Sequence, residues 1–196
     1  SNIALKKALK IWLKGYSTPD KSDIYIFFAG HGLASNDGKD LYLLPYDGEP
    51  RLLEDTALLR SEIFNIVKGI KPKSVTVFLD ACYSGLNREK EMILTDVRPI
   101  TIVPNEKDVP ENFTLFSASS GSQISGSLPE AYHGLFSYFL MKGLEGDADV
   151  NNDKRITNGE LHTYVHSNVT RQALRLGREQ TPQLQGDESR VLVDFN

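Results

Sequence analysis

The sequence is poor in cysteine, has no basic excess and contains no long apolar run. One cysteine among 196 residues excludes an internal disulfide framework and leaves a single free thiol, Cys82. A net charge of −4 gives no electrostatic reason to expect nucleic acid as a partner. No apolar run approaches the roughly 18 residues that cross a bilayer, so we expect no membrane partner. No export signal is visible, which makes the cytoplasm the default compartment.

The residues that are present suit one globular domain, because 40% are hydrophobic and 24% are charged. The chain opens without an initiator Met and directly in a helical pattern, so we expect further residues upstream of Ser1 in the natural protein. That pattern predicts an apolar helix face made of Ile3, Leu5, Leu9, Ile11, Trp12 and Leu13.

Strand and helix patterns alternate along the rest of the chain, which predicts an α/β fold with a parallel sheet. We expect strands at 24–29, 40–47, 75–79, 113–119 and 190–195. We expect helices at 56–69, 133–144 and 158–176, the first with Thr56 as a cap and Gly69 as a stop. Between them, residues 86–112 mix charges with three prolines and have no sustained period.

Two strand ends carry reactive residue types. Cys82 follows the apolar run 75–79 in the stretch VTVFLDACYSG, and His31 follows 24–29 in FFAGHG. An isolated cysteine is most often a buried structural residue. A histidine at the end of a neighbouring parallel strand changes that reading, because it can generate the reactive thiolate. His162 and His166 lie one helical turn apart without an evident third ligand, so a solvated helix face is favoured over a metal site.

The stretches YIFFAGHG and FLDACYSG resemble the two catalytic motifs of caspase-like cysteine peptidases. Their separation of 51 positions is close to the roughly 50 of the caspase pattern. Asp before Ala-Cys is more similar to the metacaspases and bacterial caspase-domain proteins than to animal caspases. The resemblance continues through residues 111–161 and REQTPQL, and it implies a three-layer sandwich. The family's first strand and helix have no counterpart in this sequence.

The resemblance divides the chain into a large-subunit-like part at 1–85, a connection at 86–112 and a small-subunit-like part at 113–196. It implies peptide-bond hydrolysis by a dyad, with Cys82 as nucleophile, His31 as general acid and base, and no catalytic cofactor. It also implies an oxyanion hole at the backbone N–H groups of Gly32 and Cys82. Glycine suits that role because it lacks a Cβ and lets a carbonyl oxygen approach.

Asp80 is the candidate specificity residue, since a carboxylate at the mouth of a cleft prefers a cation. In the metacaspase branch this acid lies in a pocket for Arg or Lys, which implies protein or peptide substrates with basic residues. The alternative is that Asp80 only caps the turn after its strand. Ser117 and Ser119, at the end of another strand, are expected to line the same cleft, and Glu130 is a weaker acidic candidate.

The connection 86–112 is either an activation segment or a plain flexible loop. In the family, activation often involves cleavage between the two parts of the domain. An enzyme that prefers basic residues would have four self-cleavage candidates there, namely Arg88, Lys90, Arg98 and Lys107.

Residues 149–160, DVNNDKRITNGE, fit the ligand spacing of an EF-hand calcium loop. Side-chain or backbone oxygens are expected at positions 1, 3, 5, 7, 9 and 12, which are Asp149, Asn151, Asp153, Arg155, Thr157 and Glu160. Position 6, where Gly normally makes the sharp turn, is Lys154, so the loop is expected to be distorted or weak. Asp-rich loops also simply cap helices.

The sequence therefore leaves three candidate functions. The first is an Arg- or Lys-directed cysteine endopeptidase, and the second is a catalytically silent caspase-like interaction module. The third is a Ca²⁺-stabilised structural domain with an incidental thiol. The presence of both His31 and Cys82 favours the first, and the sequence leaves the oligomeric state open.

Overall fold

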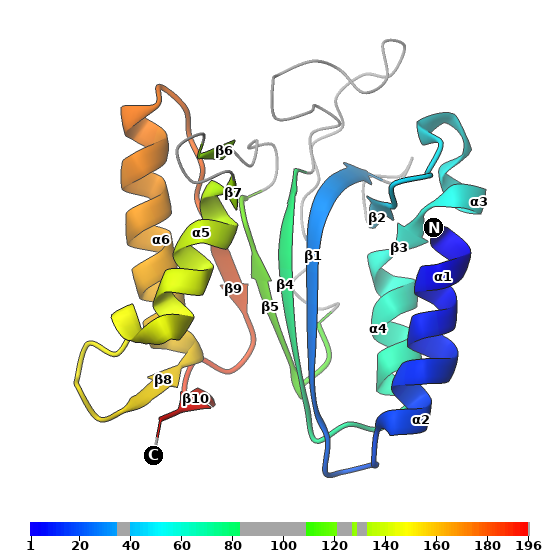
Figure 1. Ribbon diagram of the computed structural model, residues 1–196, viewed down its shortest axis with the longest axis horizontal. Coiled ribbons are helices and arrows are strands. Elements are labelled where there is room, and N and C mark those ends of the chain that lie inside the picture. Colours follow the sequence, from blue (N-terminus) through cyan, green and yellow to red (C-terminus); the bar gives the residue numbers. More distant parts are fainter. Residues whose placement is uncertain (35–39, 83–108, 121–126, 129–132, 196) are drawn as a thin grey trace.

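The structure is a computed structural model that describes residues 1–34, 40–82, 109–120, 127–128 and 133–195. A mixed six-stranded sheet lies between two groups of helices (Figure 1). The strand order is β3-β2-β1-β4-β5-β9, with the parallel pairs at the centre. This arrangement confirms the predicted α/β class with a mostly parallel central sheet and flanking helices.

The centre of the sheet consists of β1 (Asp23–Ala34), β4 (Ser74–Cys82) and β5 (Phe113–Ser117). Residues 75–81 are all buried, as expected for a β-branched apolar run covered on both faces. Two of these strands, β1 and β4, are longer than the sequence predicted. β1 continues through Gly30, His31 and Gly32, because residues 31–34 pair with β2 (Leu41–Leu44) after the parallel pairing with β4 ends.

The outer strands are antiparallel to their neighbours. β3 (Leu58–Leu59) pairs with β2, and β9 (Gln183–Gln185) pairs with β5. The predicted last strand exists as β10 (Val191–Asp194), but it pairs with β8 (Arg155–Thr157) in a separate two-stranded sheet. The sequence pattern missed β9, since its three residues contain only one apolar side chain.

The prediction of one helix over 56–69 is correct at its end and wrong at its start. α4 covers Arg60–Lys68 and has Gly69 as its C-cap. Thr56 instead ends a separate short helix, α3 (Leu53–Thr56), which follows the 3-10 turn Pro50–Leu52. The physical reason is β3, whose pairing with β2 buries Leu58 as a strand residue.

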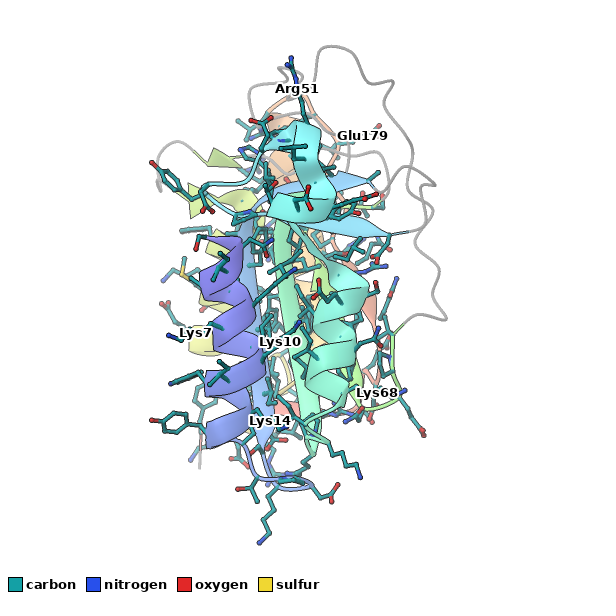
Figure 2. All side chains as sticks on the ribbon, turned by 90° about the vertical axis from the view of Figure 1, so that its right-hand side faces the viewer. Lys7, Lys10, Lys14, Arg51, Lys68 and Glu179 are labelled. Carbon is teal, nitrogen blue, oxygen red and sulfur yellow. The ribbon has the colours of Figure 1, made fainter. Side chains whose placement is uncertain are left out.

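The N-terminal helix runs through α1 (Asn2–Lys7), a π-helical stretch (Ala8–Leu13) and α2 (Lys14–Tyr16). Its inner face is Leu5, Leu9 and Leu13, which pack against the core under α4. Four residues make slightly more than one turn of an α-helix and slightly less than one turn of a π-helix. Side chains spaced by four therefore stay on one face of this mixed helix. Figure 2 shows this helix beside α4, and Lys10 forms an ion pair with Glu62 of α4 at 3.4 Å.

Part of the predicted apolar face is wrong. Ile3, Ile11 and Trp12 are 80%, 64% and 60% exposed, so only the residues spaced by four contact the core. No helix among the described residues combines the length and apolar character needed to cross a bilayer.

The second helical layer consists of α5 (Leu135–Lys142), a π-helical end (Gly143–Asp147) and α6 (Asn158–Arg175). It packs on Phe78 and Phe116 of the sheet, whose rings stack at 5.1 Å between centroids. The two-residue strands β6 (Ser127–Leu128) and β7 (His133–Gly134) precede α5.

One part of β1 is covered less than the rest of the sheet. Among the described residues, β1 pairs with β2 only over 31–34, so residues 23–30 have a strand partner on the β4 side alone. Tyr25 and Phe27, on the face away from α1 and α4, are 57% and 55% exposed. Apolar surface therefore remains open along this strand.

Candidate active site

The carboxyl ends of the three parallel strands meet at one edge of the sheet. β1, β4 and β5 run in the same direction and end beside one another, at the opposite end from the turn that joins α2 to β1 (Figure 1). The main chain N–H of Ala118 continues this pairing by donating to the carbonyl of Leu79 at 2.9 Å. Groups carried by separate parts of the sequence are gathered here, as in other parallel sheets.

His31 and Cys82 are brought together by the register of β1 and β4. The two residues are direct partners at the last position of the parallel pairing. Adjacent strands lie about 4.8 Å apart, so the two backbones are immediate neighbours. His31 is exposed at this position. Gly32, the expected oxyanion donor, is the next residue of β1; it is buried and pairs with Leu43 of β2.

Asp80 lies two residues before Cys82 on β4 and pairs with Ala29 of β1. It is fully buried, with 0% of its surface exposed, and its contact with a basic substrate side chain stays a prediction. Its Oδ2 atom accepts a hydrogen bond from Ser137 Oγ of α5 at 2.5 Å. The acid is therefore held beneath α5, next to the edge that carries His31.

The end of β5 is also buried. Ser117 and Ser119 are 8% and 1% exposed, so neither presents an open surface, and their contact with substrate stays a prediction. Gln180, itself 1% exposed, donates from Nε2 to the carbonyl of Ala118 at 3.0 Å. The segment after α6 thus supports the chain immediately beyond β5.

The sequence analysis missed Ser137 and Gln180 as neighbours of the site. A signal for Ser137 was available, because it is a polar residue in the apolar helical stretch GLFSYFL. A buried hydroxyl at such a position needs a partner. Gln180 had no comparable signal, since it lies in a polar stretch where an exposed side chain is the usual outcome.

The loop 149–160 folds with several features of the predicted EF-hand pattern. Lys154 at position 6 adopts the left-handed backbone conformation, with φ of 65°, that Gly usually supplies there. Ile156 at position 8 is fully buried. α6 then begins after Thr157 with a capping box formed by Thr157 and Glu160. The expected distortion at Lys154 is therefore absent from the backbone.

The oxygen atoms of this loop are engaged in local hydrogen bonds. Asp149 accepts from the main chain N–H groups of Asp153 and Lys154, at 3.2 and 3.0 Å. Glu160 Oε1 accepts from Asn151 Nδ2 at 2.9 Å, which brings the predicted positions 3 and 12 together. No group of three or more His, Cys, Asp or Glu side chains in the described part of the chain is arranged to hold a metal ion.

His162 and His166 are neighbours on α6, with ring centroids 5.5 Å apart. His162 Nε2 lies 3.4 Å from the carbonyl of Pro182. Burial lowers the pKa of His162 below its usual value. The sequence favoured a solvated helix face here, but His162 is half-buried and ties α6 to the chain after Gln180.

Several candidates lie outside the described residues. These are the four proposed self-cleavage points Arg88, Lys90, Arg98 and Lys107, together with Glu130.

Comparison with known proteins identifies the family and agrees with the fold. The model of the caspase domain family matches residues 3–193. The crystal structure of caspase-1 from Spodoptera frugiperda matches with a TM-score of 0.57 and 14% sequence identity, over 97% of this chain and 69% of that one. No curated protein matches the sequence. Assignment to the metacaspase branch and to bacteria stays a prediction.

Proposed function

Because the chain belongs to the caspase domain family, we propose that it is a cysteine endopeptidase that cleaves protein substrates after Arg or Lys. The observation that carries the proposal is the register of the sheet, which pairs His31 with Cys82. The family and the caspase-like fold support a cysteine peptidase. The roles of His31 and Cys82 and the preference for Arg or Lys are the more specific parts of this proposal.

In this mechanism His31 takes the proton of the Cys82 thiol, and the sulfur attacks the carbonyl carbon of the scissile peptide bond. The carbonyl oxygen becomes an oxyanion that accepts hydrogen bonds from the main chain N–H groups of Gly32 and Cys82. The C–N bond then breaks, and His31 gives a proton to the leaving amine, which leaves a thioester on Cys82. Water attacks the thioester, and His31 takes a proton from that water. The C–S bond breaks, the carboxylic acid product leaves, and His31 returns the proton to the Cys82 sulfur.

Specificity for a basic residue comes from Asp80. Opposite charges attract more strongly in the low-dielectric interior than in water, so a buried carboxylate favours a positively charged partner. Asp80 lies two residues from Cys82 along β4, which corresponds to about 6.6 Å of strand. A long basic side chain next to the scissile carbonyl is able to extend over this distance.

The test is turnover of fluorogenic peptides that end in Arg, Lys or Asp, with Cys82→Ala as the matched control. We expect cleavage after Arg and Lys only, and none by the variant. Cleavage after Asp alone would refute the role of Asp80. No cleavage of any peptide would favour a silent interaction module over an enzyme.

Calcium binding by the loop 149–160 is a separate proposal. The left-handed Lys154, the buried Ile156 and the contact between Asn151 and Glu160 support it. In this proposal Asp149, Asn151, Asp153, Arg155 (through its carbonyl), Thr157 and Glu160 supply the oxygen atoms. The ion would join the end of the α5 segment to the start of α6, and no catalytic step depends on it.

A further inference from the structure

Ser137 is a polar residue on an otherwise apolar, buried face of α5. Its neighbours Leu135, Phe136 and Leu140 belong to the core between α5 and the sheet, and Ser137 itself is only 7% exposed. Serine is a weaker helix former than the apolar residues around it. Placing its hydroxyl in the interior costs free energy unless the hydroxyl is hydrogen bonded.

The partner of this hydroxyl is the acid beside the proposed catalytic pair. Ser137 Oγ donates to Asp80 Oδ2 at 2.5 Å, and both residues are buried. Asp80 comes from the first part of the chain and Ser137 from the last, 57 positions later. The bond therefore connects the two parts of the domain directly at the site.

We propose that Ser137 is a positioning residue that orients the Asp80 carboxylate toward the basic side chain of the substrate. The inference rests on the proposed function, in which Asp80 selects Arg or Lys. A hydrogen bond to Oδ2 restricts the rotation of the carboxylate. It also offsets part of the cost of keeping an acid in the interior. Residues from both parts of the domain thus contribute to the proposed specificity site.

The substrate constants should separate this role from simple packing. We expect Ser137→Ala to raise KM for an Arg peptide about tenfold, the usual effect of losing a hydrogen bond to a charged group. We expect kcat to stay within roughly twofold, because in this proposal Ser137 acts on Asp80 and not on the reacting atoms. Ser137→Thr keeps a hydroxyl and should restore KM toward the wild-type value.

Two further variants make the experiment decisive. Leu140→Ala loosens the packing of α5 but leaves the hydroxyl in place, so we expect its KM to stay near wild type while its urea midpoint falls. If Leu140→Ala raises KM as much as Ser137→Ala, the effect is packing and the inference is wrong. Asp80→Asn should raise KM for Arg peptides at least as much as Ser137→Ala.

The outcomes distinguish this inference from the proposed function. A normal KM in Ser137→Ala with a raised KM in Asp80→Asn refutes the positioning role and leaves the specificity of Asp80 intact. A normal KM in Asp80→Asn, or no turnover by the wild type, refutes the proposed specificity or activity, and the positioning role fails with it.

Discussion

His31 and Cys82 occupy opposite positions in the register of two adjacent parallel strands. They are 51 positions apart in sequence, yet the pairing of β1 with β4 makes them neighbours at the edge of the sheet. The hydrogen bonds of the sheet therefore hold the two backbones in place, which favours preorganised chemistry. His31 is exposed there, so a substrate is able to reach it.

Replacing the histidine should remove activity without unfolding the protein. We expect His31→Ala to lower kcat/KM by roughly 100- to 10,000-fold, the usual contribution of a general acid and base. The urea midpoint should change little, because His31 is exposed. His166→Ala, on α6, is the matched control and should keep wild-type activity. Equal losses in the two variants would contradict the dyad.

The lone thiol allows the same pair to be tested without a substrate. Iodoacetamide can label only Cys82, because the chain has no other cysteine. If His31 helps to form the thiolate, alkylation at neutral pH should slow in His31→Ala. Mass spectrometry measures the rate, and unchanged labelling would mean that His31 does not activate the sulfur.

Removing the charge of Asp80 should change which peptides are cleaved. We expect Asp80→Asn to lower kcat/KM for an Arg peptide by roughly 10- to 100-fold, since a charged hydrogen-bond partner is lost. Cleavage after neutral residues should fall much less. The control is Asp147→Asn, an exposed residue beyond α5. A uniform fall for all peptides would indicate structural damage rather than altered specificity.

The sequence predicted the parts of the fold that have strong local signals. The run 75–79 shows a strand buried on both faces, and 158–176 shows a long helix; both are present. The predictions failed where pairing between distant segments decides the structure. Leu58 became a strand residue through β2, and β9 formed from a polar segment through its contact with β5.

The same contrast between local signals and distant contacts applies to the candidate site. Motifs at strand ends mark the candidates His31, Cys82 and Asp80, and the structure pairs the first two in register. The burial of Asp80 could not be predicted, because it depends on the packing of α5 over β4. Ser137 was overlooked for the same reason, since its partner lies 57 positions earlier.

Calcium should stabilise the chain through the loop 149–160. We expect added Ca²⁺ to raise the thermal midpoint of the wild type, because a ligand that binds only the folded state stabilises it. Glu160→Gln should abolish the rise, and Tb³⁺ luminescence should report the same loss of binding. Glu179→Gln, an exposed acid after α6, is the control. A rise that persists in Glu160→Gln would place the ion elsewhere.

The core between the sheet and α5 should tolerate little truncation. Phe116 is fully buried and stacks on Phe78, so Phe116→Ala should lower the free energy of unfolding by about 3–5 kcal/mol. Phe27→Ala removes the same ring from a 55% exposed position and should cost far less. Urea unfolding measures both, and similar losses would contradict the assigned burial.

His162 should make folding stability depend on pH. Burial is the largest effect on its pKa and lowers it; His166 acts in the same direction, and Glu188 and the bond to Pro182 oppose it. The folded state therefore favours the neutral ring. This stabilisation is fully present above the unfolded value near 6.5 and is lost as the pH falls through the lower, folded value.

The change to measure is His162→Gln, which replaces the titrating ring with a neutral amide. We expect the difference in unfolding free energy between the protein with His162 and the variant to be constant above pH 7. Below about pH 6.5 it should move steadily against the protein with His162. Both proteins carry His166→Gln, because His166 acts on the pKa of His162; the other two histidines are unchanged between them. A difference that does not change with pH would mean that His162 titrates alike in the folded and unfolded chains.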